Sequence, residues 1–413
     1  MQLGQNGAFL RRHNRSLVLW MLRNRGPISR RQICEETGLG PATVTSLMAG
    51  LIDEGLVEVV GKSPARSTEG GRSRILLDLK PAGAMVAGIH LGVRRVQVAL
   101  ADQRGTLHAT DSRLRRAGAG PEETVAFAGR MLDGLLRRLP GTAIRGTGVS
   151  VPVVVDVDTG TIPHAPELEW GDGIRLAPLL RHALPQPVVV GNSRNGMLLA
   201  ESLFGAARGE AAAILLHPAS TMGAAFMVGH RIIQPSHVAA SRIGHVVIDP
   251  HGPPCECGAR GCLNAVAGDR ALIELARRRL GRPLEPVDLL GMTEDGDRAA
   301  RSIVTGAVRA IATAASHAIL MLDIDLLLVS GWIAESRGAV LDDLRRRVAP
   351  HVERVTGRAP RIVAGDFGTS PQLVSAVSLA LDRFVYRSPG GSPISWSGDR
   401  ILAEVGTDAA RRL

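Results

Sequence analysis

Residues 245–262 constrain the fold of this chain more than any other stretch. They hold one histidine and three cysteines in the spacing H-x9-C-x-C-x4-C, separated mainly by glycine, proline and other turn residues. Such a segment bends its backbone around one point. Zinc prefers four nitrogen or sulfur ligands in a tetrahedron. The segment therefore predicts one zinc ion, held by His245, Cys255, Cys257 and Cys262.

The ligand count indicates which kind of zinc site this is. A catalytic zinc keeps one position open for water, whereas a structural zinc has all four positions filled by protein. We therefore predict a structural zinc. The alternative is a disulfide between two of the cysteines. We favour zinc because no secretory signal opens the chain, which places it in the cytoplasm, where cysteines stay reduced. No apolar run approaches the length of a membrane span, so no membrane partner is expected.

Charge is concentrated toward the N-terminal end. The chain carries a net charge of +10, and residues 1–80 hold twelve Lys and Arg against seven Asp and Glu, a net of +5. The total alone is weak evidence for a nucleic-acid partner. Its distribution indicates where such a partner would bind.

The pattern of residues 1–80 predicts a winged helix-turn-helix domain. Helical spacing of apolar residues marks three segments, 14–25, 29–37 and 41–54. Ser29 and Gln32 form a capping-box pattern at the start of the second, and Pro41 suits the first position of the third. Two strand patterns, 56–60 and 74–79, flank a loop over 61–73. That order places a β-hairpin wing after the third helix.

The third helix is expected to enter the major groove of double-stranded DNA. Its outward side chains include Thr43, Thr45 and Ser46, none of which gives bidentate base recognition, so base discrimination should be modest. Arg66, Arg72 and Arg74 in the wing are expected to reach the minor groove or the phosphates. The alternative is a dimerisation module without DNA contact, which would leave the basic wing without a purpose.

After residue 80 the pattern changes to short apolar strands and amphipathic helices. The first series comprises strands 85–91, 96–101, 144–151 and 188–190, with helices 121–139 and 194–204. A second series begins with strands 211–216 and 224–228 and continues through the helix 298–322 into the strand 326–330. Two similar series predict two related α/β lobes with a cleft between them.

The sequence around the cysteines resembles that of a known family. The block Ile243-Gly244-His245…Cys255-Glu256-Cys257-Gly258-Ala259-Arg260-Gly261-Cys262-Leu263-Asn264 is similar to the zinc motif of the ROK family of repressors and sugar kinases. The helix-turn-helix, with Gly70-Gly71-Arg72 in its wing, resembles that of the repressor branch. The resemblance extends to about residue 386. It implies an actin-like (sugar kinase/Hsp70-type) body of two lobes and a homodimer or a dimer of dimers.

Together these features predict an α/β chain of four parts. A winged helix-turn-helix occupies residues 1–80 and a first actin-like lobe residues 81–194. The second lobe, with the zinc site, spans 195–386, and its last helix is expected to pack back on the first lobe. Residues 387–413 lie outside the resemblance and are expected to form a mobile tail.

Two departures from the family motifs bear on catalysis. Family kinases carry an Asp-x-Gly-Gly-Thr phosphate loop, which here is His90-Leu91-Gly92-Val93-Arg94. Their Asn-Asp-x-Asn motif, whose Asp is the catalytic base, is here Asn192-Ser193-Arg194-Asn195. A serine without a partner does not act as a base near neutral pH. We therefore predict no phosphoryl transfer and no enzymatic activity.

The sugar pocket that the resemblance implies is also altered. Its Gly-Glu-Ile-Gly-His motif is here Ser241-Arg242-Ile243-Gly244-His245, its Cys-Leu-Glu ends in Asn264, and its Pro-Asn-Leu contains Glu167. The implied effector-binding residues are Glu167, Asn192, Arg242, His245 and Asn264. The guanidinium of Arg242 favours an anionic sugar derivative, such as a sugar phosphate or sugar acid. Alternatively, Arg242 pairs internally, for instance with Glu167, and the pocket binds nothing.

The predicted function is that of a DNA-binding transcriptional regulator. We expect a repressor of carbohydrate-related or secondary-metabolite genes that binds a pseudo-palindromic operator and carries a catalytically inactive sensor body. One alternative is an active ATP-dependent sugar kinase fused to a DNA-binding module. Another is a zinc-stabilised scaffold without a DNA target.

Overall fold

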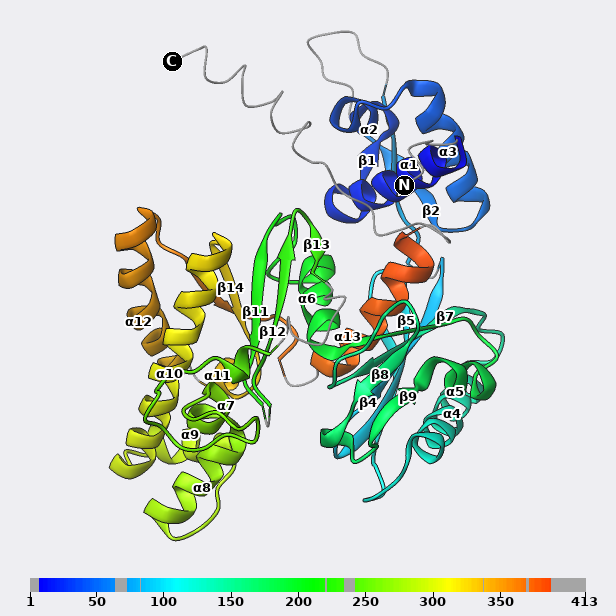
Figure 1. The fold of residues 1–413 in the computed structure, drawn as a ribbon. Coiled ribbons are helices and arrows are strands. Elements are labelled where there is room, and N and C mark those ends of the chain that lie inside the picture. Colours follow the sequence, from blue (N-terminus) through cyan, green and yellow to red (C-terminus); the bar gives the residue numbers. More distant parts are fainter. Residues whose placement is uncertain are drawn as a thin grey trace. The chain divides into compact units, whose positions relative to one another are not determined.

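The computed structural model describes residues 7–63, 73–81, 83–219, 221–233, 242–336, 338–368 and 371–387. The chain divides into two compact units (Figure 1). Unit 1 contains residues 1–191 together with residues 376–413, and unit 2 contains residues 192–375. The C-terminal segment therefore groups with the N-terminal part of the chain. The proposed tail lies outside the described residues, except for Arg387.

Unit 1 begins with a small helical and β domain, which we call the head. Its helices are α1 (Gly7–Arg25), α2 (Arg30–Thr37) and α3 (Pro41–Asp53). Its sheet has the order β1-β3-β2, formed by β1 (Ile28–Ser29), β3 (Ile75–Leu79) and β2 (Val57–Lys62). Three helices followed by a β-hairpin are the arrangement of a winged helix-turn-helix. The two-residue strand β1 is too short to leave a periodic pattern, and it was not expected.

Local chemistry sets the helix boundaries in the head. The Ser29 and Gln32 side chains form both bonds of the predicted capping box at the start of α2. Gly38 ends that helix at a φ of 70°, a left-handed conformation that favours glycine. Pro41 occupies the first turn of α3, as expected. Val44, Met48 and Leu51 form the buried face of α3.

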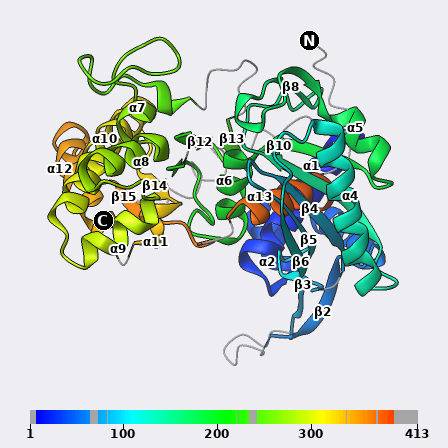
Figure 2. The same cartoon turned by 90° about the horizontal axis from the view of Figure 1, so that it is seen from below.

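The larger part of unit 1 is a five-stranded sheet of order β10-β7-β4-β5-β6. Its strands are β4 (Met85–Leu91), β5 (Arg95–Asp102), β6 (Leu107–Leu114), β7 (Ile144–Val151) and β10 (Val188–Asn192). The helices α4 (Pro121–Arg138) and α5 (Leu176–Ala183) share a core with one face of this sheet (Figures 1 and 2). A ribbon of β8 (Thr161–His164) and β9 (Asp172–Arg175) adjoins this core.

The C-terminal helix α13 (Pro371–Leu381) covers the other face of the unit 1 sheet. Ala87 and Ile89 belong to the α4 core, so the intervening Gly88 points the opposite way. A Cβ at Gly88 would lie 2.7 Å from the Val377 side chain, and one at Gly148 would lie 2.1 Å from the Ala376 carbonyl oxygen. Glycine at these two positions therefore admits α13 at close range.

Unit 2 has a sheet of order β13-β12-β11-β14-β15. Its strands are β11 (Ala213–His217), β12 (Gly223–Val228), β13 (Arg231–Ile232), β14 (Leu326–Val329) and β15 (Arg361–Ala364). The helices α10 (Arg298–Leu322) and α12 (Ala339–Thr356) share a core with one face, and α6 (Ser193–Phe204) packs on the other. Shorter helices surround this core: α7 (Leu263–Ala267), α8 (Asp269–Leu280), α9 (Pro286–Glu294) and α11 (Trp332–Glu335).

The two large sheets share one topology. In each, the first three strands form an antiparallel meander, as in β4-β5-β6 and β11-β12-β13. The next strand then returns to pair in parallel with the first, as β7 does with β4 and β14 with β11. The similar strand series in the sequence therefore corresponds to two sheets of the same design.

The helix α10 is long and apolar enough to cross a membrane by length and composition alone, which the sequence analysis did not anticipate. However, 61% of its most apolar window is buried inside the protein. Its Ile303, Ala307, Ile311 and Ile319 are part of the unit 2 core. The core of a folded domain therefore accounts for the apolar character of α10.

Candidate metal centre and DNA-binding face

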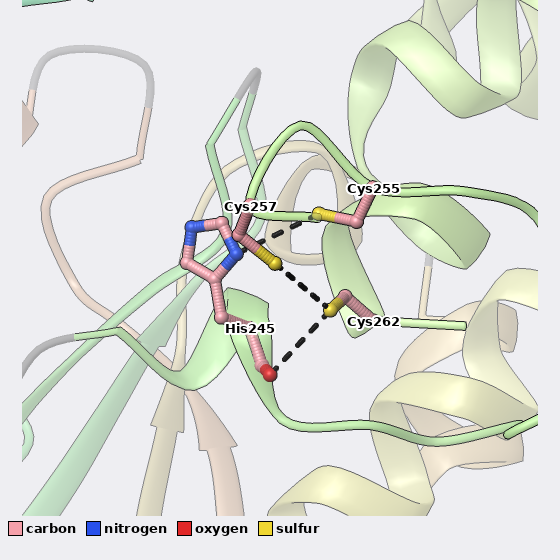
Figure 3. Close-up of side chains that lie close together, drawn as sticks. All are labelled: His245, Cys255, Cys257 and Cys262. Carbon is pink, nitrogen blue, oxygen red and sulfur yellow. Dashed lines mark hydrogen bonds between the residues drawn. The ribbon is translucent and has the colours of Figure 1, made fainter. Parts of the chain in front are cut away.

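One histidine and three cysteines of unit 2 converge on a single point (Figure 3). His245 ends the 3₁₀ turn η2 (Ile243–His245), and Cys262 is the N-cap residue of α7. Between them, the Cys255 amide donates to the Ala259 carbonyl at 2.8 Å and closes a tight turn that carries Cys257. At Gly261, with a φ of 65°, a Cβ would overlap the Asp249 carbonyl oxygen, so this bend requires glycine.

The distances suit a tetrahedral metal. All ligand atoms of the four residues lie within 4.8 Å of one another. The Sγ of Cys255 lies 3.6 Å from His245 Nδ1, and the Sγ atoms of Cys257 and Cys262 are also 3.6 Å apart. Ligands around zinc are separated by roughly 3.5–3.8 Å, given its bond lengths. All four cysteines of the chain are free thiols, which contradicts the disulfide alternative. The four side chains can therefore hold a metal ion, and the donor set is one that zinc prefers.

The thiols of the cluster differ in their environment. A hydrogen bond from the Ala259 amide, with others among the cluster side chains, lowers the pKa of Cys257 to about 7. Burial, followed by the neighbouring thiols, raises the pKa of Cys262 to about 12. A metal ion deprotonates the thiols that coordinate it. Binding of a metal here would therefore release protons, chiefly from the buried side of the cluster.

The predicted DNA-reading residues lie on the exposed face of α3. Thr43, Thr45 and Ser46 are all exposed, and the opposite face of the helix packs into the head. Arg74 is exposed at the start of the returning wing strand, where its carbonyl accepts from the Ser63 amide at 2.8 Å. Arg66 and Arg72 lie outside the described residues, so their part in the interface stays a prediction.

The residues predicted to bind an effector are divided between the two units. Glu167 is half-buried in the 3₁₀ turn η1 (Pro166–Leu168) of unit 1, whereas Asn192, Arg242, His245 and Asn264 belong to unit 2. In unit 2, the Asn264 side chain lies against Gly244, in a segment where Arg242 is exposed and His245 is half-buried. The pocket as a whole stays a prediction.

Two of these residues already serve the fold. The Asn264 Oδ1 accepts a hydrogen bond from the Met222 amide at 2.8 Å. The Asn192 Oδ1 accepts from the Arg194 amide at 2.9 Å and caps α6. The amide side chains at both positions therefore help to hold local backbone.

His90, which the resemblance matches with the Asp of the kinases' phosphate loop, is buried. Its Nδ1 lies 2.9 Å from the Ser150 Oγ. Burial lowers the pKa of His90 to about 4, so the imidazole is neutral near pH 7. The sequence shows the loss of the Asp, but no local signal reveals this pairing, because Ser150 lies sixty residues away on β7.

The residue that the resemblance matches with the kinase base, Ser193, is buried as well. Its carbonyl accepts a hydrogen bond from the Ser375 Oγ at 2.8 Å. The next residue, Arg194, is also buried, and its Nη2 donates to the Thr221 carbonyl at 2.8 Å. A Cβ at Gly223 would lie 1.8 Å from the Arg194 Nε, so glycine makes room for this side chain. Sequence analysis missed this buried arginine.

Comparison with known proteins places these features in context. The ROK family matches residues 86–383, which is more than half of the chain. The xylose repressor of Bacillus subtilis (strain 168) is 24% identical over 380 residues, covering 92% of this chain and 97% of the repressor. An alignment of this length is too long to be confined to the residues that the family model matches.

Two solved structures show the same fold. A ROK family transcriptional regulator, described as a homologue of the E. coli MLC protein, matches with a TM-score of 0.78 at 21% identity and covers 90% of this chain and 96% of its own. A ROK family glucokinase from Streptomyces griseus, solved with glucose and AMPPNP, matches with a TM-score of 0.64 at 22% identity. It covers 72% of this chain and 100% of the glucokinase. These matches confirm the predicted fold class.

Proposed function

The chain belongs to the ROK family, and from this premise we propose that it is a DNA-binding transcriptional repressor without enzymatic activity. One observation carries the proposal. The helix α3 buries one face in the head and exposes Thr43, Thr45 and Ser46 on the other, next to a β-hairpin wing. The relative that aligns along nearly the whole chain is named a repressor. We further propose cytoplasmic localisation, as for any regulator that reaches chromosomal DNA.

The proposed mode of binding follows from the exposed side chains. Hydroxyl groups on α3 contact phosphates, single base acceptors or thymine methyl groups, and the basic wing contributes contacts to phosphates or the minor groove. A homodimer or a dimer of dimers presents two heads to the DNA. Its operator is then pseudo-palindromic, with half-sites one or two helical turns of about 10 base pairs apart. The regulated genes are those of carbohydrate or secondary metabolism.

The proposed lack of phosphoryl transfer rests on two positions. Kinases of the family place carboxylates where this chain has the buried His90 and Ser193. A neutral imidazole and a buried hydroxyl offer neither a metal–phosphate ligand of the usual kind nor a base for the sugar hydroxyl. The body is thus proposed to act as a sensor, stabilised by one structural zinc on His245, Cys255, Cys257 and Cys262.

The proposed effector is anionic. Arg242 stands where the family has a sugar-binding carboxylate, and the Asn264 Oδ1 is engaged by the Met222 amide. A neutral sugar would lose two strong acceptors for its hydroxyl groups, at about 1–3 kcal/mol for each group left unpaired. A sugar phosphate or sugar acid gains a charge-assisted bond to a guanidinium instead. This chain should therefore differ from its xylose-repressor relatives in ligand preference.

A selection experiment tests the DNA-binding function. The full-length zinc-loaded protein is incubated with random duplexes, and bound DNA is sequenced. An enriched palindrome supports the proposal, and its absence favours a scaffold without a DNA target. Incubation of the same protein with ATP and a panel of hexoses tests the kinase alternative. Sugar turnover that a mutation at Ser193 abolishes would overturn the non-enzymatic assignment.

A thermal-shift screen tests the effector. Glucose, N-acetylglucosamine and xylose are compared with hexose phosphates and sugar acids. We expect stabilisation by an anionic sugar, its loss in Arg242→Ala, and its retention in Arg309→Ala, a control on α10. A strong shift with a neutral sugar would contradict the anionic assignment, as would an anionic shift that persists in Arg242→Ala.

A further inference from the structure

The C-terminal end of α3 is held by residues of the unit 1 sheet. Gln103 follows β5 and is fully buried. Its Nε2 donates to the Leu56 carbonyl at 2.7 Å and also to the Lys80 carbonyl. Leu56 comes just after α3, and Lys80 just after β3. One side-chain amide therefore joins both ends of the wing hairpin to the sheet.

A second residue completes this junction from the C-terminal segment. Tyr386 ends the π-helical turn η3 (Asp382–Tyr386), and its hydroxyl donates to the Gln103 carbonyl. The Arg23 guanidinium of α1 lies over the Tyr386 ring, 5.1 Å from its centre. Gln103 is therefore bonded through its side chain to the head and through its backbone to Tyr386.

Charged contacts support the same end of α3. Glu54 is its C-cap residue, and the Glu54 carbonyl accepts from Arg145 of β7 at 3.1 Å. The Glu54 carboxylate accepts from Arg15 of α1 at 2.7 Å, and Arg15 also donates to the Val385 carbonyl at 3.3 Å. Residues of the sheet and of α1 thus bind the C-terminal end of α3, and Arg15 also connects it with the turn η3.

The path of the chain connects this junction with unit 2. The helix α13 begins with residues 371–375 of unit 2 and continues into unit 1, where η3 follows it directly. Within unit 1 it packs against Gly88 and Gly148 so closely that a Cβ atom at either position would overlap atoms of α13. This close packing fixes α13 on the unit 1 sheet, and with it the turn η3 that carries Tyr386.

We propose that Gln103 and Tyr386 are positioning residues that fix the orientation of α3 relative to the first lobe. The proposal rests on the DNA-binding function proposed above. Neither residue needs to touch DNA. In a dimer with two heads, the orientation of each head sets which half-site spacing both can engage at once. Buried hydrogen bonds at the root of the head restrict that spacing.

Operators with altered spacing test this proposal. The palindrome selected by the full-length protein is rebuilt with one base pair added or removed at its centre, which rotates one half-site by about 35°. We expect the wild-type protein to lose affinity by roughly tenfold or more, which is the scale of a lost specific contact. Gln103→Glu replaces the donor with a carboxylate facing two carbonyls. In this variant, the loss of affinity caused by the altered spacing should fall below about threefold. Its affinity for an isolated half-site should equal that of the wild type.

Two further variants make the test decisive. Tyr386→Phe removes only the hydroxyl and should relax the spacing preference to a smaller degree. Gln97→Glu, the same substitution six positions earlier on β5, should keep the wild-type profile. If Gln103→Glu does not fold, as judged by zinc content and thermal unfolding, Tyr386→Phe decides the question. Identical spacing profiles in the wild type and the folded variants would overturn the positioning role. Failure of the wild type to select any DNA would instead overturn the proposed function.

Discussion

The two large sheets share their strand order but are held together in different ways. In unit 1, glycines at positions 88 and 148 admit α13 onto the sheet, and ordinary apolar packing completes both faces. In unit 2, the chain between β13 and α10 includes the cysteine loop, where Val246, Val247 and Cys257 are exposed. Its four ligand side chains can hold a metal ion, and no such cluster lies beside the unit 1 sheet among the described residues. The two sheets thus share a topology but differ in what accompanies them: close helix packing in one unit and a candidate metal cluster in the other.

Each unit buries a titratable group whose pKa is strongly shifted, and the two shifts have opposite directions. Unit 1 buries His90, whose pKa is lowered to about 4 by burial. Unit 2 buries Glu201 of α6, and burial raises the pKa of that carboxyl to about 7. In both cases the neutral form is favoured, but one group gains a proton on acidification and the other loses one on alkalinisation. The pH dependence of the two units should therefore have opposite signs.

The largest expected effect separates the units by metal. Cys262→Ser should reduce bound zinc from one ion per chain to almost none and destabilise unit 2, because a structural zinc contributes directly to folding. Hydrogen exchange should show loss of protection in α7 and α8, with the unit 1 sheet much less affected. Cys34→Ser in the head is the matched control and should retain the zinc. Full protection of unit 2 in zinc-free Cys262→Ser would mean that the loop does not need the metal.

This contrast also shows what a sequence can reveal. The three helices of the head, the helices α4, α6 and α10, most of the strands and the four-residue cluster were predicted because periodicity and ligand spacing are local properties. The sequence analysis did not predict α5, α7, α8, α9, α11 or α12. The strand β6 was missed because its mostly exposed side chains lack an alternating apolar pattern. Gln103, Arg194 and the His90–Ser150 pair were missed because their partners are distant in the sequence. Only the tertiary structure brings such groups together.

The next effect is acid sensitivity of unit 1. The folded-state pKa of His90, about 4, is below its ordinary value of 6.5, so the unfolded chain binds the proton more readily. Stability is then complete above pH 6.5 and decreases as the pH falls toward 4, by about 3 kcal/mol in total. His90→Asn should remove most of this slope. Denaturant unfolding of unit 1 between pH 7.5 and pH 4, followed by hydrogen exchange of peptides from that unit, measures this dependence of the unfolding free energy on pH. An unchanged slope in the variant would rule out His90 as its source.

An effect of similar size and opposite sign is expected in unit 2. The folded-state pKa of Glu201 lies above its ordinary value of 4.5, so its contribution is present below pH 4.5 and is lost as the pH rises toward 7. The loss should be similar in size to that of unit 1, because this shift of the pKa is as large as that of His90 and already includes the bonds from the Ala206 and Asp366 amides, at 2.9 and 2.8 Å. Hydrogen exchange of α6 at pH 5 and 7 should detect it. In Glu201→Gln, which cannot ionise, the difference between the two pH values should disappear.

The smallest expected effect leaves both sheets intact and changes DNA binding alone. Arg74 is exposed at the base of the wing, so Arg74→Ala should alter neither zinc content nor the stability of either unit. If Arg74 contacts a phosphate, its loss should weaken binding by about 1 kcal/mol across many DNA sequences and reduce the slope of log affinity against log salt by about 1. Arg309→Ala, which removes an exposed arginine of unit 2, should leave both quantities unchanged.

Thr43→Ala should instead shift the preference at one or two base pairs while preserving the salt slope. A single hydroxyl contributes to the recognition of bases and not to the release of counterions. Affinities measured at several salt concentrations on matched and mismatched operators distinguish these outcomes. An Arg74→Ala protein with the wild-type salt slope would show that Arg74 makes no phosphate contact.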